Sequence, residues 1–422
     1  MRMSPDGPAP CDAAGWWHIL CWQAAVLPCL HAEAQDGRTE MAQESSCDVV
    51  VIGGGPAGCT AAAELAARGL EVMLFEKERV PHHKCCAGGV TRAALDLLPK
   101  AVQPLVSREV RMLVIRSVDG DSVTWECDEP FMYTVSRAEV DALLWHQAIH
   151  SGANAADEVA VTAVIPDDDG VLVTTTNGAV AARYVVGADG AGSRTAHLIG
   201  CGHPEHVALG VALNVTGIHT HPIEQEEASK LILGLGVGTY GWVFAHAYGS
   251  SIGLEAHWGV RDVDDKLSTL LQIEGHTWDN VAQRCAHPIP SLPGENGLGV
   301  GRVLLVGDAA ALAHPLTGEG IRYAVLSGRL AAEAILEEAS NPPLESYTAS
   351  VEQKILPDLR AGLSLLKTVT GRERLVIPLA QRSQHAYERL IDVLTGRSTF
   401  AQSIEIFGGL GHIARLLTRG MS

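Results

Sequence analysis

The sequence lacks a long apolar run, an excess of basic charge and paired cysteine motifs. No stretch of about 18–20 consecutive apolar residues occurs, which predicts that no helix spans a membrane. The formal net charge of −18 argues against a nucleic-acid partner. The ten cysteines have no CxxC spacing, so we predict reduced thiols in a cytoplasmic protein rather than a disulfide framework. With 44 glycines and 47% hydrophobic residues, the 422-residue chain has the composition of an α/β enzyme of two or three domains.

Residues 1–43 differ in character from the rest of the chain. The apolar stretch from Trp16 to Leu30 is too short to span a bilayer. Asp6 and Asp12 precede it, where a secretory signal would carry basic residues. The segment is therefore predicted to be a disordered extension or the product of a misplaced start, with a membrane-touching tail as the alternative.

A glycine-rich turn between a strand and a helix is the strongest local signal. Residues 49–52 are β-branched and predict a short buried strand. A GxGxxG pattern over residues 53–58 then turns the chain into a helix that begins near Pro56. Residues 71–76 predict a second strand, which ends in Glu76, an acid placed to hold the two hydroxyl groups of a ribose. This spacing predicts dinucleotide binding.

The three glycines of the GxGxxG pattern have different structural roles. Gly53 permits the tight turn, and Gly55 lets a pyrophosphate approach the backbone. Gly58 lets the helix pack closely on the strand, and the N-terminus of that helix supplies amides to the phosphates.

Two further turns follow predicted strands. Residues 185–194 turn from strand to helix around Asp189, with an ordinary Asp-Gly turn as the alternative interpretation. Residues 303–308 predict a buried strand that ends in Gly-Asp, where Asp308 can accept hydrogen bonds from a polyol. The turn at Gly318, ahead of a long Ala/Leu-rich helix, offers amides to an electron-rich ring edge.

The loop over residues 84–89 reads Lys-Cys-Cys-Ala-Gly-Gly. Its two adjacent glycines, Gly88 and Gly89, predict a backbone packed against a flat or bulky group. A zinc site is disfavoured, because one extended loop cannot bring its four candidate ligands together tetrahedrally. Those candidates are His82, His83, Cys85 and Cys86.

Residues 207–260 alternate apolar and polar side chains, which predicts an antiparallel sheet. Within it Tyr240, Trp242 and Phe244 fall on one face, where they either line a cavity or form an ordinary sheet core.

Arg137 lies in the first turn of a helix predicted to open at the N-cap residue Ser136. Its charge either complements Glu139 or Asp141 on the surface, or faces a cofactor, since it follows a β segment.

The tail over residues 344–422 predicts helices broken at Gly371, Pro378 and Gly396. From residue 351 onward it holds 10 Lys/Arg against 6 Asp/Glu, a net charge of +4 on an otherwise acidic protein. This basic face is suited to anionic lipid head groups or a diphosphate, or is simply solvated.

Taken together, the three glycine turns resemble those of the FAD-dependent para-hydroxybenzoate hydroxylase-like fold over residues 43–345. Within that fold, residues 84–89 look like the K-x-C-G-G-G loop of the geranylgeranyl reductase family. Residues 240–244 look like its P-x-x-Y-x-W-x-F-P signature, with Val237 and Ala245 in place of the prolines. Residues 315–321 also closely resemble the corresponding segment of this family.

The resemblance implies that FAD binds along the three turns, with its pyrophosphate on the first and its pyrimidine edge at Gly318. The implied cofactor-binding residues are Gly53, Gly55, Pro56, Ala57, Gly58, Glu76, Lys77, Arg137, Asp189, Gly307, Asp308, Gly318, Gly320 and Ile321. Cys86 falls on the cysteine position of the family and is the implied catalytic residue. Tyr240, Trp242 and Phe244 are the implied substrate-binding residues.

The family saturates carbon–carbon double bonds of prenyl chains, so the expected substrate is a prenyl lipid, diphosphate or quinone. The expected electron donor is NADPH or a reduced ferredoxin-like protein, and peripheral contact with the cytoplasmic membrane face is compatible with such a substrate. A flavin monooxygenase or halogenase on the same fold is the main alternative. A non-catalytic flavoprotein is the third.

The predicted fold is mixed α/β, with a Rossmann-type FAD-binding domain, an inserted antiparallel-sheet substrate domain and a C-terminal helical region. The predicted boundaries are an extension at 1–43, FAD-binding parts at 44–110, 136–205 and 291–343, a β segment at 111–135, the substrate domain at 206–290 and the helices at 344–422.

Overall fold

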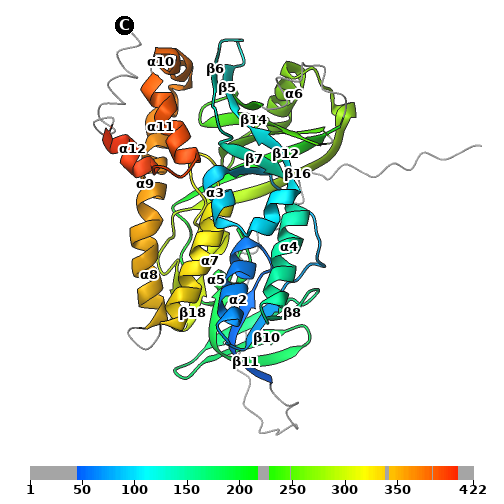
Figure 1. Ribbon diagram of the computed structural model, residues 1–422, viewed down its shortest axis with the longest axis vertical. Coiled ribbons are helices and arrows are strands. Elements are labelled where there is room, and N and C mark those ends of the chain that lie inside the picture. The colour runs from blue at the N-terminus through cyan, green and yellow to red at the C-terminus, as the bar shows by residue number, and fades with distance from the viewer. Residues whose placement is uncertain (1–44, 217–227, 248, 338–341, 383, 407–422) are drawn as a thin grey trace, which may run out of the picture. The chain divides into compact units, whose positions relative to one another are not determined.

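Two large β-sheets, a three-stranded sheet and a set of covering helices organise the chain from residue 45 onward (Figure 1). The structure is a computed structural model, and it describes residues 45–216, 228–247, 249–337, 342–382 and 384–406. The predictions for residues 1–43 and for the tail beyond residue 406 lie outside the described residues. The mixed α/β architecture predicted from the sequence is confirmed.

The eight-stranded sheet carries the glycine turns. Its main path is β17-β18-β11-β1-β2-β8, and β9 and β10 branch from β11. The strands are β1 (Ser45–Ile52), β2 (Val72–Phe75), β8 (Asn154–Ala156), β9 (Val161–Pro166), β10 (Val171–Thr175), β11 (Gly178–Gly187), β17 (Gly299–Val300) and β18 (Val303–Leu305). β1 pairs in parallel with both β11 and β2, so the turns at the ends of these strands meet at one edge of the sheet.

The apolar run in β1 is continuous because both faces of this strand are covered. Val49 and Val51 pack against α2 (Pro56–Ala67), α4 (Arg137–His150) and α7 (Ile321–Leu336). Val50 and Ile52 pack against side chains of β9 and β10 on the other face. A strand buried on both sides needs no polar alternation, which is why the sequence reads as a run of β-branched residues. Ser136 is the N-cap residue of α4, but its side chain makes no capping hydrogen bond.

The seven-stranded sheet has the order β16-β12-β15-β14-β13-β5-β6. Its strands are β5 (Met112–Ser117), β6 (Ser122–Glu126), β12 (His206–Val215), β13 (Ala228–Leu233), β14 (Thr239–His246), β15 (Gly249–His257) and β16 (Val281–Ser291). The predicted antiparallel sheet is confirmed for β12 to β16, but β13 pairs with β5 in parallel. The β5–β6 hairpin, which the sequence places in a separate segment, therefore extends this sheet.

Short elements connect the sheets. The three-stranded sheet joins β3 (Gly89–Thr91), β7 (Met132–Val135) and β4 (Val106–Val110). The remaining connecting elements are α3 (Arg92–Leu97), η3 (Lys100–Leu105), α5 (Arg194–Leu198), α6 (Val263–Ile273), η5 (Trp278–Asn280) and η6 (Gly307–Ala310). α6 packs Leu267, Leu270 and Leu271 against one face of the seven-stranded sheet, which leaves the opposite face to line the site described below.

The tail forms helices, as predicted, but one predicted break is wrong. The elements are α8 (Pro343–Lys354), α9 (Leu356–Val369), η7 (Glu373–Leu375), α10 (Val376–Arg382), α11 (Gln384–Leu394) and α12 (Phe400–Ile406). Gly371 and Gly396 lie between helices, whereas Pro378 lies inside α10. Pro378 is the third residue of that helix, in the first turn, where a proline removes no intrahelical hydrogen bond.

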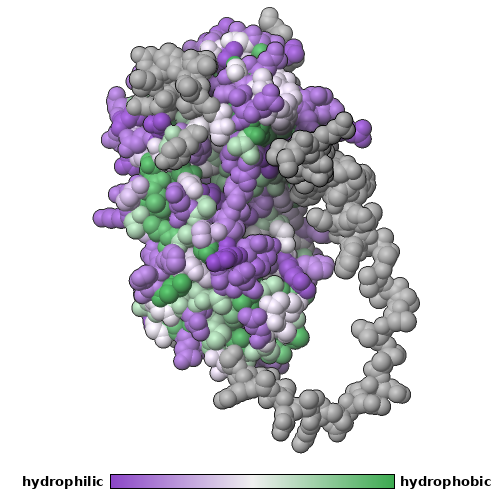
Figure 2. Space-filling view, turned by 90° about the vertical axis from the view of Figure 1, so that its right-hand side faces the viewer, coloured by the Kyte–Doolittle hydropathy of each residue, from purple (hydrophilic) through white to green (hydrophobic). Residues whose placement is uncertain are grey.

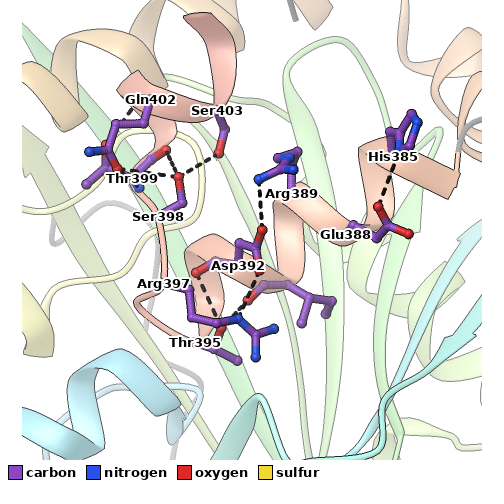
Figure 3. Close-up of polar contacts among 11 residues, drawn as sticks. His385, Glu388, Arg389, Asp392, Thr395, Arg397, Ser398, Thr399, Gln402 and Ser403 are labelled. Carbon is purple, nitrogen blue, oxygen red and sulfur yellow. Dashed lines mark hydrogen bonds and ion pairs between the residues drawn. The ribbon is translucent and has the colours of Figure 1, made fainter. Parts of the chain in front are cut away.

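Part of the basic charge of the tail is neutralised within the tail itself. Asp392 accepts a hydrogen bond from Arg389 at 3.1 Å and another from Arg397 at 2.9 Å (Figure 3). These pairs, with the Ser398 and Thr399 contacts beside them, hold the connection between α11 and α12.

Hydrophobic side chains on the face shown in Figure 2 gather in patches between polar ones. Across the described ranges, no helix combines the length and the apolar character needed to cross a bilayer.

Candidate active site

A cavity of about 1410 Å³ joins the glycine turns to one face of the seven-stranded sheet. Its lining includes all the site residues predicted from the sequence except Gly58 and Gly307, which lie behind it. The predicted residues that line it are Gly53, Gly55, Pro56, Ala57, Glu76, Lys77, Cys86, Arg137, Asp189, Tyr240, Trp242, Phe244, Asp308, Gly318, Gly320 and Ile321. Residues far apart in the sequence are thus brought to one continuous space.

The first glycine turn leaves room on the cavity side and none on the side of the sheet. A Cβ added to Gly55 would meet no atom within 4 Å. A Cβ on Gly58 would collide with the carbonyl oxygen of Gly53, because α2 lies directly on the turn. Gly53 itself has φ +110°, a backbone conformation that other residues rarely adopt. The close helix–strand packing predicted for Gly58 is confirmed, and an extended group such as a pyrophosphate fits the open side at Gly55.

Glu76 is fixed at the end of β2 by two backbone amides. Its Oε2 accepts from the N–H of Gly54 at 2.7 Å, and its Oε1 accepts from the N–H of Glu78 at 2.9 Å. Each carboxylate oxygen has a further lone pair, so this buried acid can still accept hydrogen bonds from a ribose at the cavity edge.

Asp189 is engaged within its own turn. Its carboxylate accepts hydrogen bonds from the hydroxyl groups of Ser193 and Thr195 and from the N–H of Thr195. This is the role expected of an ordinary Asp-Gly turn at the start of α5, and a contact with the cofactor stays a prediction.

Arg137 and Asp141 form a buried ion pair rather than a surface one. The Nε and Nη2 atoms of Arg137 contact Oδ1 and Oδ2 of Asp141 at 3.0 and 2.8 Å. Their side chains are 11% and 9% exposed, because the first turn of α4 faces the cavity. Arg137 also interacts with Cys86, so its charge is placed beside the predicted catalytic residue.

A cluster of Lys84, His287 and Asp308 was not predicted as a unit. Nζ of Lys84 lies 3.3 Å from Nε2 of His287, which lies 3.7 Å from Oδ2 of Asp308. Burial lowers the pKa of Lys84, although the charge of Asp308 opposes this shift. Burial acts to raise the pKa of Asp308, but the interaction with His287 and the charge of Lys84 outweigh it and lower that pKa. No motif marks His287, which reaches this place through the pairing of β16 with β12.

The loop over residues 84–89 crosses the sheet face as its glycines predict. A Cβ on Gly89 would press on the ring of Phe244 at 2.9 Å, and one on Gly88 would meet the ring of His246. Nε2 of His246 lies 3.0 Å from the carbonyl oxygen of Ala87. The flat groups expected against these two glycines are therefore aromatic side chains of β14, and this prediction is confirmed.

Cys85 forms a disulfide with Cys285, with a Cα–Cα distance of 5.6 Å. The prediction that all cysteines are reduced thiols is wrong for this pair. The two residues are 200 positions apart, and only the packing of the 84–89 loop on β16 brings them together. Cys86 stays a free thiol, whose sulfur accepts a hydrogen bond from the N–H of Gly88 at 3.3 Å.

Tyr240, Trp242 and Phe244 lie on the cavity side of β14, opposite the core packed by α6. Val243, between two of them, belongs to that core instead. The indole of Trp242 lies across Gly253 of β15, where any side chain would collide with it, and its Nε1 donates to Ser251 at 3.2 Å. The three aromatic residues therefore form a wall of the cavity.

The sequence is similar to those of known reductases. The FAD binding domain family matches residues 46–229. The chloroplastic geranylgeranyl diphosphate reductase of Oryza sativa subsp. japonica is 30% identical over 321 residues, which cover 69% of this chain and 67% of that protein. A menaquinone reductase of Mycobacterium tuberculosis is 30% identical over 318 residues, which cover 70% of this chain and 78% of that protein.

Solved structures share the fold. A geranylgeranyl bacteriochlorophyll reductase-like protein from Thermoplasma acidophilum superposes with a TM-score of 0.69 at 21% identity, over 86% of this chain and 94% of that one. A flavin-dependent brominase superposes with a TM-score of 0.67 at 17% identity, over 86% and 99% of the two chains. At such identities the likeness establishes the fold alone, whereas the sequence relatives establish the family. The chain belongs to the geranylgeranyl reductase family of FAD-dependent oxidoreductases.

Proposed function

We propose that the protein saturates carbon–carbon double bonds of a prenyl chain with reduced FAD as the hydride donor. The observation that carries the proposal is the cavity, which runs without interruption from the glycine turns to the aromatic wall. A flavin at the turns and an apolar chain at the wall would share one continuous space. Apolar residues of the tail, among them Leu363 and Leu366 of α9 and Leu390 of α11, complete its lining.

The residues present fit FAD. The open side of Gly55 and the start of α2 would hold the pyrophosphate, Glu76 the adenosine ribose and Asp308 the ribityl chain. The turn at Gly318 would face the ring edge. When bound, the reduced flavin supplies the hydride, and the residues of this chain bind the acceptor, exclude water and provide the proton.

Cys86 is the catalytic residue of this proposal, with two candidate roles. As a free thiol beside Arg137 it supplies the proton to the second alkene carbon, or it shapes the 84–89 loop over the cofactor. Because Cys85 and the two glycines fix the loop on either side of it, both roles are compatible with its position.

We further propose a prenyl lipid, a prenyl diphosphate or a quinone as the acceptor, and NADPH or a reduced ferredoxin-like protein as the electron donor. A cytoplasmic enzyme that meets its acceptor at the membrane face suits these substrates. The Cys85–Cys285 disulfide removes one argument for a reducing compartment, so location is best tested by fractionation.

The direct test is a single-turnover reaction without oxygen. The purified holoprotein, reduced anaerobically, is mixed with prenyl diphosphates, prenyl lipids and menaquinones, and flavin reoxidation is followed by absorbance. We expect reoxidation with at least one acceptor, whose mass rises by two hydrogen atoms for each bond reduced. Reoxidation only by oxygen, with an oxygen or halogen atom added to the substrate, would instead identify a monooxygenase or halogenase.

Trp242→Ala should weaken binding of the prenyl acceptor while FAD stays bound. Loss of a large apolar contact should raise the acceptor Kd about 10- to 100-fold, in line with the transfer free energy of such a side chain. The measurement is acceptor binding to the holoprotein, with acceptors of several chain lengths. Because Trp242 is buried, Trp242→Phe serves as a milder variant.

Trp258→Ala is the matched control, because Trp258 is 48% exposed and lies outside the cavity lining. Unchanged affinity and an unchanged range of accepted chain lengths in Trp242→Ala would show that the aromatic residues are only sheet core.

A further inference from the structure

Glu255 is a buried carboxyl group in the cavity that no motif marks. It lies on β15 directly opposite Tyr240 of β14, and its residue is 6% exposed. The hydroxyl group of Tyr240 donates to Oε2 of Glu255 at 2.8 Å. Among the described residues this is the one hydrogen bond that the carboxyl group receives, and no basic side chain pairs with it. A buried acid without a cation is costly to ionise and calls for a role.

The position of Glu255 is where the two halves of the cavity meet. A Cβ added to Gly318 would collide with Oε2 of Glu255, so the carboxyl group touches the turn that precedes α7. On the other side, Tyr240 and Trp242 continue the same sheet face into the aromatic wall. A ring bound at the turn and a chain bound at the wall would therefore come together at this carboxyl group.

From this geometry we propose that Glu255, hydrogen-bonded by Tyr240, is the acid that protonates the second alkene carbon. The inference rests on the proposed function and deepens it, and it leaves Cys86 the role of shaping the loop. In the step, the π bond breaks as hydride from the reduced flavin bonds to one carbon. The other carbon bonds to the proton of Glu255, which becomes a carboxylate and is reprotonated from solvent.

The protonation state of Glu255 supports this role. Burial raises its pKa to about 7, and the hydrogen bond from Tyr240 opposes the shift. Burial, followed by the nearby charge of Glu255, raises the pKa of Tyr240 well above its usual value, so Tyr240 stays protonated. A carboxylic acid with a pKa near 7 is matched to proton transfer at neutral pH.

Among the described residues, few other titratable groups face this pair. β12 contributes Gly210, which has no side chain. The turn contributes Gly318 and Glu319, and the carboxyl group of Glu319 accepts a hydrogen bond from Thr91. His257 follows two residues later on the same face of β15 but is exposed. His287, opposite Gly210 on β16, belongs to the cluster with Lys84 and Asp308.

The test compares Glu255→Gln, Tyr240→Phe and wild type in the anaerobic single-turnover reaction across pH. In the wild type, flavin reoxidation by the prenyl acceptor should fall about tenfold per pH unit above pH ~7, where the acid is lost. Glu255→Gln should keep FAD and acceptor binding and lose roughly 10²- to 10⁴-fold in rate. Its rate should not show the fall above pH ~7, which we call the alkaline limb of the pH profile. Tyr240→Phe removes the hydrogen bond that lowers the pKa of Glu255. The rate of this variant should therefore begin to fall at a higher pH than that of the wild type.

Glu274→Gln is the control, since Glu274 is a buried glutamate that pairs with Lys230 away from the cavity and should not move the limb. A readout independent of turnover is the infrared difference spectrum between wild type and Glu255→Gln, in which the protonated carboxyl band of Glu255 should titrate near pH 7.

An active wild type with an equally active Glu255→Gln variant and an unchanged pH profile would overturn the assignment and leave the proposed function standing. A wild type that reduces no prenyl acceptor would overturn the proposed function, and the proton-donor role with it.

Discussion

Gly55→Val is expected to give a folded protein that contains no FAD. The new side chain would extend into open cavity space, because a Cβ at this position meets no protein atom within 4 Å. The backbone of Gly55 has φ −79° and ψ −177°, which valine adopts without strain. Loss of a favourable N-cap residue should cost about 1 kcal/mol of stability at most. The valine would therefore oppose only the pyrophosphate, and the purified protein should be colourless.

The flavin content is measured from the absorbance of the purified protein, and folding from circular dichroism and thermal unfolding of the apoprotein. Gly58→Val is the informative contrast, since its side chain would collide with the carbonyl oxygen of Gly53 and should destabilise the fold itself. A soluble Gly55→Val protein that remains yellow with full flavin content would place the cofactor elsewhere.

Cys86→Ser should retain FAD and lose most alkene reduction. The thiol receives the N–H of Gly88 and interacts with Arg137, so it couples the loop to the start of α4. A small displacement of a loop that positions reactants can lower the rate about 10²-fold. The measurement is the anaerobic single-turnover rate with a prenyl acceptor, recorded across pH. If Glu255 is the acid, the rate of Cys86→Ser should still fall above pH ~7.

Cys85 is not a neutral control for this experiment, because it is bonded to Cys285. Cys201→Ser is the better one, since the thiol of Cys201 donates to the carbonyl oxygen of Asn296 and lies outside the cavity lining. Equal activity in the Cys86 and Cys201 variants would remove Cys86 from the mechanism. If the fall in rate above pH ~7 disappears in Cys86→Ser but persists in Glu255→Gln, the thiol is the proton donor instead.

The parts of the site that could be predicted from sequence are those written in short stretches of chain. The turn at residues 53–58 and the Gly-Asp at 307–308 each join a strand to its following element, so the spacing alone places them at the same sheet edge. The same is true of the alternation that puts Tyr240 and Trp242 on one face.

The contacts that could not be predicted from the sequence are those that depend on which strands pair. Glu255 meets Tyr240 through the β14–β15 register, and Cys285 in the middle of β16 meets Cys85 because this strand passes beside the 84–89 loop. His287 joins Asp308 in the same way. A polar residue in an alternating strand reads as an ordinary outward position until its register is known. Contact of the basic tail with lipid head groups or a diphosphate stays a prediction, although Asp392 pairs with two of its arginines.

Neither large sheet is built from one continuous stretch of chain. β18 pairs with β11 across more than a hundred residues, and the edge of β5 is completed only when β13 pairs with it. A nascent chain emerges from the ribosome in sequence order, so the first glycine turn exists long before the Gly307 and Gly318 turns that complete the cavity. Pairings this distant are closed late, because their loop entropy must be overcome first. The cavity is then complete only after these pairings have formed, and until β13 pairs with β5 the open edge of β5 is a place where newly made chains can associate.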